Sequence, residues 1–219
     1  MARPIVVFVA ESLRLAPPLT EAEAASLRNA FALDLFDRFA RHRAPYALGV
    51  AADPSERAWF AEHAPRDATI FESKGRALVG EAFAGGFGPL AILGTNVPTL
   101  PAARVDRLVE PLVAEPRAAD VTIGLDRAGG WWGLGLAAPS PALVDLAESG
   151  NGSVALATLR RAAEAGLRVE KVGSWGGVAT IDDLAALATE LRDARVRESA
   201  PRTAAAVERL GFLPPWGAP

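Results

Sequence analysis

Apolar segments with the pattern of buried strands alternate with amphipathic helical segments along almost the whole chain. Residues 5–10 are continuously apolar, as expected for a strand buried on both faces. After them, Thr20 and Glu23 have the spacing of a capping box, which predicts a long amphipathic helix that ends near Arg41. Repeated strand–helix alternation predicts an α/β fold with a mostly parallel central sheet flanked by helices.

The same patterns predict the remaining elements. We expect strands at about 46–51, 68–71, 89–94, 120–124, 131–136 and 168–172. We expect helices at about 54–63, 74–83, 101–113, 141–147, 153–165, 181–195 and 203–210. No linker divides the chain, so we expect one domain over residues 1–219, with a core at about 4–195 and a C-terminal helix and proline-rich tail at about 199–219.

Composition excludes several classes of function. The chain has no cysteine, so a thiol nucleophile, a disulfide framework and a cysteine-based metal site are excluded. Its net charge of -3 gives no sign of a nucleic-acid partner. The apolar N-terminal run is too short to span a membrane and lacks the layout of a signal peptide, so we expect a cytoplasmic protein without a membrane partner. His42 and His63 lie in charged helical surroundings, where we expect solvated side chains rather than metal ligands.

Three segments together resemble one family, and the first of them lies at the carboxyl end of a central strand, where α/β sheets bind ligands. They are Gly94-Thr95-Asn96-Val97-Pro98, Arg127-Ala128-Gly129-Gly130-Trp131 and the segment from Trp175 to Leu184. Their order is similar to that of a bacterial family of small glycosyltransferases of the GT-A-like type, often associated with radical-SAM/selenodomain proteins and belonging to the nucleotide-diphospho-sugar transferase superfamily. That family has roughly G-T-D-x-P, E-D-G-G-Y and W-x-D-V-D-T-x-x-D-L in these places.

The resemblance implies a GT-A-like fold, but the acidic residues of the family motifs are missing. Their positions hold Asn96, Ala128, Gly177 and Ala179. In GT-A enzymes such an acid holds a divalent cation that neutralises the diphosphate leaving group. An asparagine amide is a poor ligand for a hard dication. We therefore expect neither a metal site nor a cofactor.

The first loop of the chain carries a further match to the family. Arg14-Leu15-Ala16-Pro17 matches the end of the family motif K-T-R-L-A-P, although the lysine and threonine of that motif are replaced by Ser12 and Leu13. In GT-A enzymes this loop lies against the nucleotide, where a basic side chain can hold phosphates. Arg14 is therefore a candidate for phosphate binding, and the alternative is an ordinary surface arginine at a turn.

The other candidate ligand-binding residues have structural alternatives too. Asn96 can contact a sugar or ribose hydroxyl, or it can cap the following loop. Gly129 and Gly130 allow close backbone approach to a ligand, and Trp131 can stack on a sugar or base; the alternative is a turn followed by core tryptophans. Asp182 and Asp183 are explained by the start of a helix capped by Thr180. The full set of candidates is Arg14, Gly94, Asn96, Pro98, Gly129, Gly130 and Trp131.

Two functions remain open at this point. The loss of acids from all three motifs favours a degenerate, non-catalytic relative that binds a nucleotide or nucleotide-sugar ligand, a protein partner or a second copy of itself. The alternative is an active, metal-independent transferase that uses a nucleotide-linked sugar donor. A nucleotidyltransferase of related fold would need the same metal chemistry.

Overall fold

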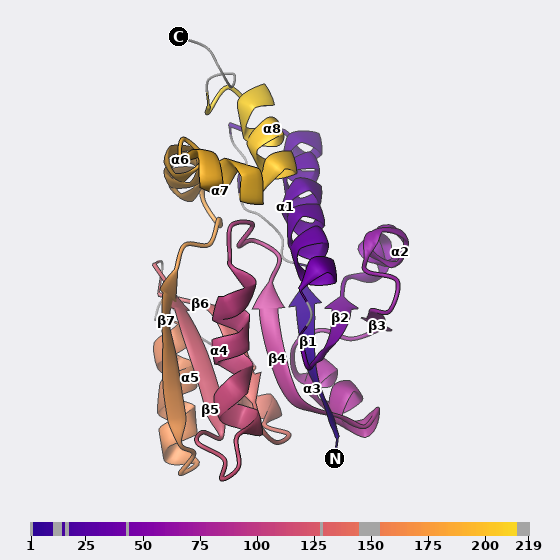
Figure 1. Ribbon diagram of the computed structural model, residues 1–219, viewed down its shortest axis with the longest axis vertical. Coiled ribbons are helices and arrows are strands. Elements are labelled where there is room, and N and C mark those ends of the chain that lie inside the picture. Colours follow the sequence, from indigo (N-terminus) through magenta and orange to yellow (C-terminus); the bar gives the residue numbers. More distant parts are fainter. Residues whose placement is uncertain are drawn as a thin grey trace.

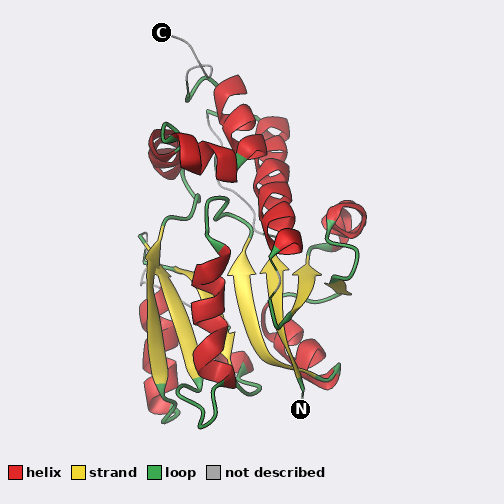
Figure 2. Ribbon diagram, viewed as in Figure 1, coloured by secondary structure: helices red, strands yellow, loops and turns green. Residues whose placement is uncertain are grey.

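The described part of the chain forms an α/β structure around a seven-stranded sheet. The computed structural model describes residues 2–10, 15, 18–42, 44–127, 129–144 and 154–213. The strand order is β3-β2-β1-β4-β6-β5-β7, and only β6 runs antiparallel to its neighbours. The mostly parallel sheet predicted from the sequence is thus confirmed (Figures 1 and 2). The strands are β1 (Arg3–Val9), β2 (Ala47–Ala51), β3 (Thr69–Phe71), β4 (Phe87–Gly94), β5 (Val121–Asp126), β6 (Trp131–Leu136) and β7 (Val169–Trp175).

Helices cover both faces of the sheet. They are α1 (Glu21–Arg41), α2 (Pro54–His63), α3 (Gly75–Ala84), α4 (Ala102–Val113), α5 (Val154–Glu164), α6 (Ile181–Glu190), α7 (Ala194–Ser199) and α8 (Pro201–Arg209), with a short 3-10 turn η1 (Pro141–Leu143). Successive residues of β1 point to opposite faces: Val6 and Phe8 pack with α1 and α4, whereas Ile5 and Val7 pack with α3 and α5. The sheet is therefore the central layer between two apolar cores.

The carboxyl ends of the parallel strands form one edge of the sheet, which we call the carboxyl edge. The register of β1 on β4 runs from Ile5 opposite Leu90 to Val9 opposite Gly94, so the two strands end level with each other. The chain leaves β1 toward β2 on one side and later returns to β4 on the other. This reversal of strand order is where open α/β sheets bind ligands.

Helix α1 connects the sheet to a group of helices beyond the carboxyl edge. The C-terminal half of α1 packs on the sheet through Leu35 and Phe39, and its N-terminal half packs on α6 and α8 through Leu27 and Phe31. In Figure 1, α6, α7 and α8 lie above the arrowheads of the strands. A third apolar core thus holds these helices over the carboxyl edge.

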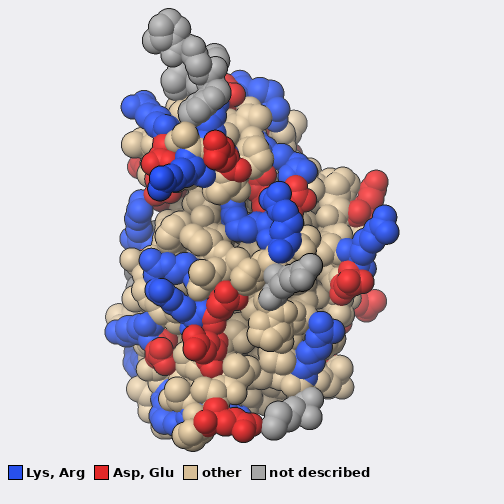
Figure 3. Space-filling model, in the orientation of Figure 1, with Lys and Arg blue, Asp and Glu red and all other residues tan. Residues whose placement is uncertain are grey.

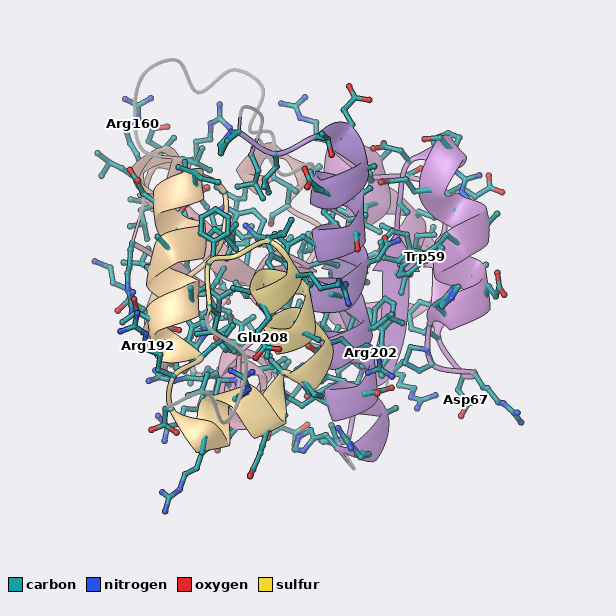
Figure 4. The ribbon with its side chains drawn as sticks, turned by 90° about the horizontal axis from the view of Figure 1, so that it is seen from above. Trp59, Asp67, Arg160, Arg192, Arg202 and Glu208 are labelled. Carbon is teal, nitrogen blue, oxygen red and sulfur yellow. The ribbon has the colours of Figure 1, made fainter. Side chains whose placement is uncertain are left out.

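A buried carboxylate fixes α8 against α1. Asp34 on α1 is 2% exposed and accepts hydrogen bonds from the backbone N–H groups of Arg202 (3.2 Å) and Thr203 (2.7 Å). These two N–H groups belong to the first turn of α8, whose N-cap residue Ala200 provides no side-chain cap. Figure 4 shows α8 lying along α1, with the labelled Arg202 at their junction.

The helices predicted near the C-terminus need correction. The single helix expected at 181–195 is two helices, because the Asp193 side chain accepts hydrogen bonds from the N–H groups of Arg195 (2.8 Å) and Val196 (3.4 Å) and starts a new helix, α7.

The strand expected at 168–172 extends to Trp175. Of the helix expected at 141–147, the described residues form only η1, and residues 145–153 lie outside the described part, as does the tail from residue 214.

The two histidines are hydrogen-bonded rather than simply solvated, contrary to the sequence-based expectation. His42 Nε2 lies 2.9 Å from Asp106 Oδ1, and His63 Nδ1 lies 2.8 Å from the carbonyl oxygen of Trp59. The first contact joins the end of α1 to α4, and the second joins successive turns of α2.

None of the helices in the described ranges is long and apolar enough to cross a membrane.

Candidate functional site

The loop that follows β4 lies at the centre of the carboxyl edge. Thr95 N–H donates to the Val9 carbonyl (3.1 Å) and so continues the pairing of β1 with β4 past Gly94. Leu100 N–H donates to the Val97 carbonyl (3.0 Å), which closes a tight turn around Pro98. Gly94 and Pro98 are buried, whereas Asn96 is partly exposed. Two of the predicted site residues therefore shape the loop, and Asn96 is the one whose side chain reaches the surface.

Asn96 lies directly against Gly177, which comes from a different motif. Val178 N–H donates to the Asn96 carbonyl oxygen (2.9 Å). A Cβ atom built on Gly177 would lie 3.3 Å from Asn96 Nδ2. Among the described residues, the Asn96 side chain makes no hydrogen bond, so its amide does not cap the following loop. The structure thus brings together two of the positions at which the resembling family has acids.

A partly buried arginine on α1 holds this loop through hydrogen bonds to its carbonyl groups. The guanidinium of Arg38 on α1 donates to the carbonyls of Pro98 (2.8 Å) and Leu100 (2.9 Å) and also to that of Ser199 at the end of α7. Burial lowers the pKa of Arg38, although nearby Asp34 opposes this. Because its donors are engaged with main-chain carbonyls, Arg38 positions the loop relative to α7.

The Gly129–Gly130 segment forms a turn between β5 and β6. Gly130 N–H donates to Asp126 Oδ1 (2.7 Å), and Asp126 N–H donates to the Gly130 carbonyl (3.0 Å). Gly129 has φ +87°, and a Cβ on Gly130 would lie 2.5 Å from Asp126 Oδ2. The turn geometry therefore accounts for both glycines and holds the Asp126 carboxylate in place. Ala128 lies outside the described residues.

The two tryptophans of β6 point to opposite faces of the sheet, as expected for consecutive strand residues. Trp132 is 1% exposed in the core under α1 and α4, and its Nε1 donates to the Gly173 carbonyl (3.2 Å). Trp131 is half-buried and packs with the core on the α3 and α5 face. Trp132 is thus a core residue.

A cavity of about 600 Å³ opens beside the Asn96–Gly177 contact. It lies between the β4–α4 loop, the end of β7 and helices α6 and α7, and we call it the Trp175 cavity. Its lining includes Thr99, Trp175, Gly176, Glu190, Asp193 and Arg195. None of the candidate residues that the structure describes lines it, since the site was expected around the β4–α4 loop and the Gly129–Trp131 segment. Trp175, which opens the third motif at the end of a parallel strand, was the signal that could have pointed to it.

Two acids that remain near the carboxyl edge, Asp183 and Glu190, have structural partners. Asp183 Oδ2 accepts the N–H groups of Ala179 (3.0 Å) and Thr180 (2.9 Å), which confirms the predicted cap of α6. Arg127 Nη2 lies 3.2 Å from Glu190 Oε1. Within the described ranges, no three His, Asp or Glu side chains come together in a group that could hold a metal ion. On the face in Figure 3, basic and acidic side chains are interspersed.

Arg14 and Ala16–Pro17 lie outside the described residues, so the structure does not place the candidate phosphate-binding arginine. Leu15, between them, is described and is 1% exposed. Leu15 belongs to the third apolar core, together with Leu27 of α1 and Val178.

The architecture has the fold of nucleotide-diphospho-sugar transferase-like structures. The structure matches a protein of Desulfovibrio desulfuricans G20 that is provisionally assigned as a nucleotide-diphospho-sugar transferase, with a TM-score of 0.79, 20% identity and 96% of each chain covered. It also matches a cytidylyltransferase of Leptospira borgpetersenii serovar Hardjo-bovis, with a TM-score of 0.54, 10% identity and coverage of 94% of this chain and 97% of the other. A third match is a CMP:2-keto-3-deoxy-manno-octonic acid synthetase in complex with CTP, with a TM-score of 0.52, 14% identity and coverage of 90% and 100%. These likenesses establish the fold.

The sequence also matches a family model. Residues 39–149, just over half of the chain, match the family described as "Uncharacterized protein conserved in bacteria (DUF2064)". The chain therefore belongs to this family. No curated protein matched the sequence.

Proposed function

We propose that this protein binds a nucleotide or nucleotide sugar at the carboxyl edge and does not transfer the sugar. It would be a degenerate relative of the radical-SAM/selenodomain-associated glycosyltransferases, acting as one cytoplasmic domain. The observation that carries this proposal is the contact between Asn96 and Gly177. Two positions that hold acids in the resembling family meet there, and both are neutral in this chain.

The charge balance of the transfer reaction supports a non-catalytic role. Breaking the bond to a nucleoside diphosphate leaves charge on the diphosphate, which a divalent cation or clustered cations must stabilise. The side chains of Asp126 and Asp183 are already held in a turn and a helix cap. Arg127 is paired with Glu190. These contacts leave little charge free to stabilise a leaving group.

The binding role is supported by the shape that the edge retains. Arg38 fixes the buried β4–α4 loop through hydrogen bonds to two of its carbonyl groups. The partly exposed Asn96 amide offers one acceptor and two donors to a ribose or sugar hydroxyl. In this proposal Arg14 contacts the phosphates. The synthetase of similar fold was solved with CTP, which supports a nucleotide as the class of ligand.

The test is an equilibrium titration of CTP, UDP, GDP and their sugar conjugates, by calorimetry, with manganese and with a chelator. We expect saturable binding of at least one of them that does not require manganese. Asn96→Leu should weaken this binding by about tenfold, because a bound hydroxyl loses its partners. Asn29→Leu, the same substitution on α1 against α8, should leave it unchanged. Absence of binding for every nucleotide, or equal affinity in both variants, would refute the proposal.

A further inference from the structure

The ring of Trp175 is held rigidly at the wall of the Trp175 cavity. Its indole Nε1 donates to Thr99 Oγ1 (3.3 Å). The guanidinium of Arg104 lies 5.5 Å from the ring centroid and donates to the Val172 carbonyl (3.4 Å), and Arg104 is not part of the cavity lining. The half-buried ring is thus held by Thr99 in the lining and by Arg104 outside it. A ligand that packs on it would cost little side-chain entropy.

The charged groups around the cavity balance each other. Two cations, Arg127 and Arg195, line it together with two carboxylates, Glu190 and Asp193. Arg127 is paired with Glu190 at 3.2 Å. A phosphate or carboxylate ligand would meet as much repulsion as attraction here, so the charge balance favours a neutral ligand.

Hydrogen-bonding capacity nevertheless remains on several of these side chains. Asp193 Oδ1 caps α7, while Oδ2 has no hydrogen bond among the described residues. The Arg195 guanidinium has no ion pair within the same ranges. Thr99 and Ser199 also line the cavity; the Ser199 hydroxyl donates to the Val196 carbonyl (2.7 Å), and its oxygen can still accept a hydrogen bond. A fixed aromatic ring is thus surrounded by donors and acceptors that can bind the hydroxyl groups of a ligand.

We propose that the Trp175 cavity binds a neutral polyhydroxylated ligand, a mono- or disaccharide, with one apolar sugar face on the Trp175 ring. A volume of about 600 Å³ has room for such a molecule. The cavity begins at Gly176, next to the Gly177–Asn96 contact, so the sugar would lie beside the ligand of the carboxyl edge. This inference goes beyond nucleotide binding and does not depend on it.

The test uses ligand-observed saturation-transfer NMR on the full chain, without nucleotide. The probes are glucose, galactose, mannose, N-acetylglucosamine and maltose. We expect saturable binding of at least one sugar, about tenfold weaker in Trp175→Ala and within about threefold of native in Trp175→Phe, which keeps a ring. Arg195→Met, which removes an exposed guanidinium from the cavity lining, should weaken binding by about threefold or more. Trp59→Ala on α2, far along the sheet from the cavity, is the matched control and should bind sugar as the native protein does.

Thermal unfolding of each variant establishes that it is folded before its affinity is compared. The proposal is overturned if no sugar of the panel saturates, if Trp175→Ala binds as tightly as native, or if inorganic phosphate displaces the sugar, since displacement would identify an anion site. Because no nucleotide is present, failure of the nucleotide titrations would leave this result untouched.

Discussion

Asn96 and Gly177 face each other across the carboxyl edge, so closely that a Cβ on residue 177 would lie 3.3 Å from Asn96 Nδ2. The backbone next to Gly177 is tied to Asn96 by the Val178 N–H bond of 2.9 Å. Residues from two distant motifs therefore form one local arrangement. Carboxylates at both positions would repel each other unless a cation lay between them.

We predict that Asn96→Asp combined with Gly177→Asp creates a manganese site. Two carboxylates at this contact would provide the oxygen ligands that hard dications prefer. The double variant should bind manganese saturably in calorimetry and gain thermal stability when manganese is added. Each single variant is the control and should bind much more weakly. Equally tight single-site binding by the native protein would contradict the account.

The buried cap of α8 gives a prediction about stability. Asp34→Ala removes the acceptor for the N–H groups of Arg202 and Thr203, and we expect a loss of about 2 to 3 kcal/mol in the free energy of unfolding. Asp37→Ala lies on the same helix and removes only an exposed pair with Arg202, so its effect should stay within about 0.5 kcal/mol. Urea unfolding measures both. Similar losses in the two variants would show that the cap does not hold α8.

We predict that residue 124 must be glycine because the Trp132 ring lies against it. A Cβ at this position would lie 2.0 Å from Trp132 Cε2, so Gly124→Ala should destabilise the protein by about 1 to 3 kcal/mol. In a Trp132→Leu background the same change should cost much less, which a double-mutant cycle detects as coupling. Gly80→Ala is the matched control: it lies in α3 with nothing within 4 Å of the new Cβ, and it should be neutral or stabilising. Additive effects in the cycle would contradict the contact.

Tyr46 gives a prediction about pH. It is the only tyrosine, it is 5% exposed, and its hydroxyl donates to Asp106 Oδ1 (3.1 Å). Burial, and then the charge of Asp106, raise the pKa of Tyr46 far above its ordinary value. Because the folded state favours the neutral phenol, this stabilisation is complete below the unfolded pKa of about 10 and is lost as the pH rises above it.

Tyrosinate absorbance follows this single residue directly. We expect the folded protein to show no tyrosinate at pH values near 10, and the signal to appear together with alkaline unfolding. The urea-unfolded chain is the reference and should titrate at about 10. Tyr46→Phe should reduce the alkaline loss of stability. Ionisation near 10 in a protein that is still folded would show that the phenol is not protected.

Local sequence patterns predicted the fold well for those elements whose ends are set by their own residues. The capping boxes at Thr20 and Thr180 are both present, and the strand at 131–136 has the predicted ends. The break at Asp193 was missed because its role as an N-cap was not recognised: its side chain accepts the N–H groups of Arg195 and Val196 and starts a new helix. The extension of β7 to Trp175 depends on pairing with β5, a nonlocal contact.

The candidate site was only partly predictable. The strand order places the β4–α4 loop and the third motif at the same edge of the sheet. The contact between Asn96 and Gly177 agrees with this placement. Trp175 at the end of a parallel strand indicated one wall of the Trp175 cavity, but the other wall depends on where α6 ends and α7 begins, which the sequence pattern did not predict. The role of Trp131 stays a prediction, since its ring packs on the α3 and α5 side of the sheet.

The central claim is that this protein holds a nucleotide sugar without breaking it. The most direct measurement mixes the protein with stoichiometric UDP-, GDP-, ADP- and CDP-sugars, with and without manganese, and follows released nucleotide against a protein-free control. The account predicts that binding occurs and that release stays at the rate of the control, because a leaving diphosphate without cations loses on the order of a hundredfold or more in rate. Rapid release that disappears in Arg14→Ala would contradict the account and would identify an active, metal-independent transferase.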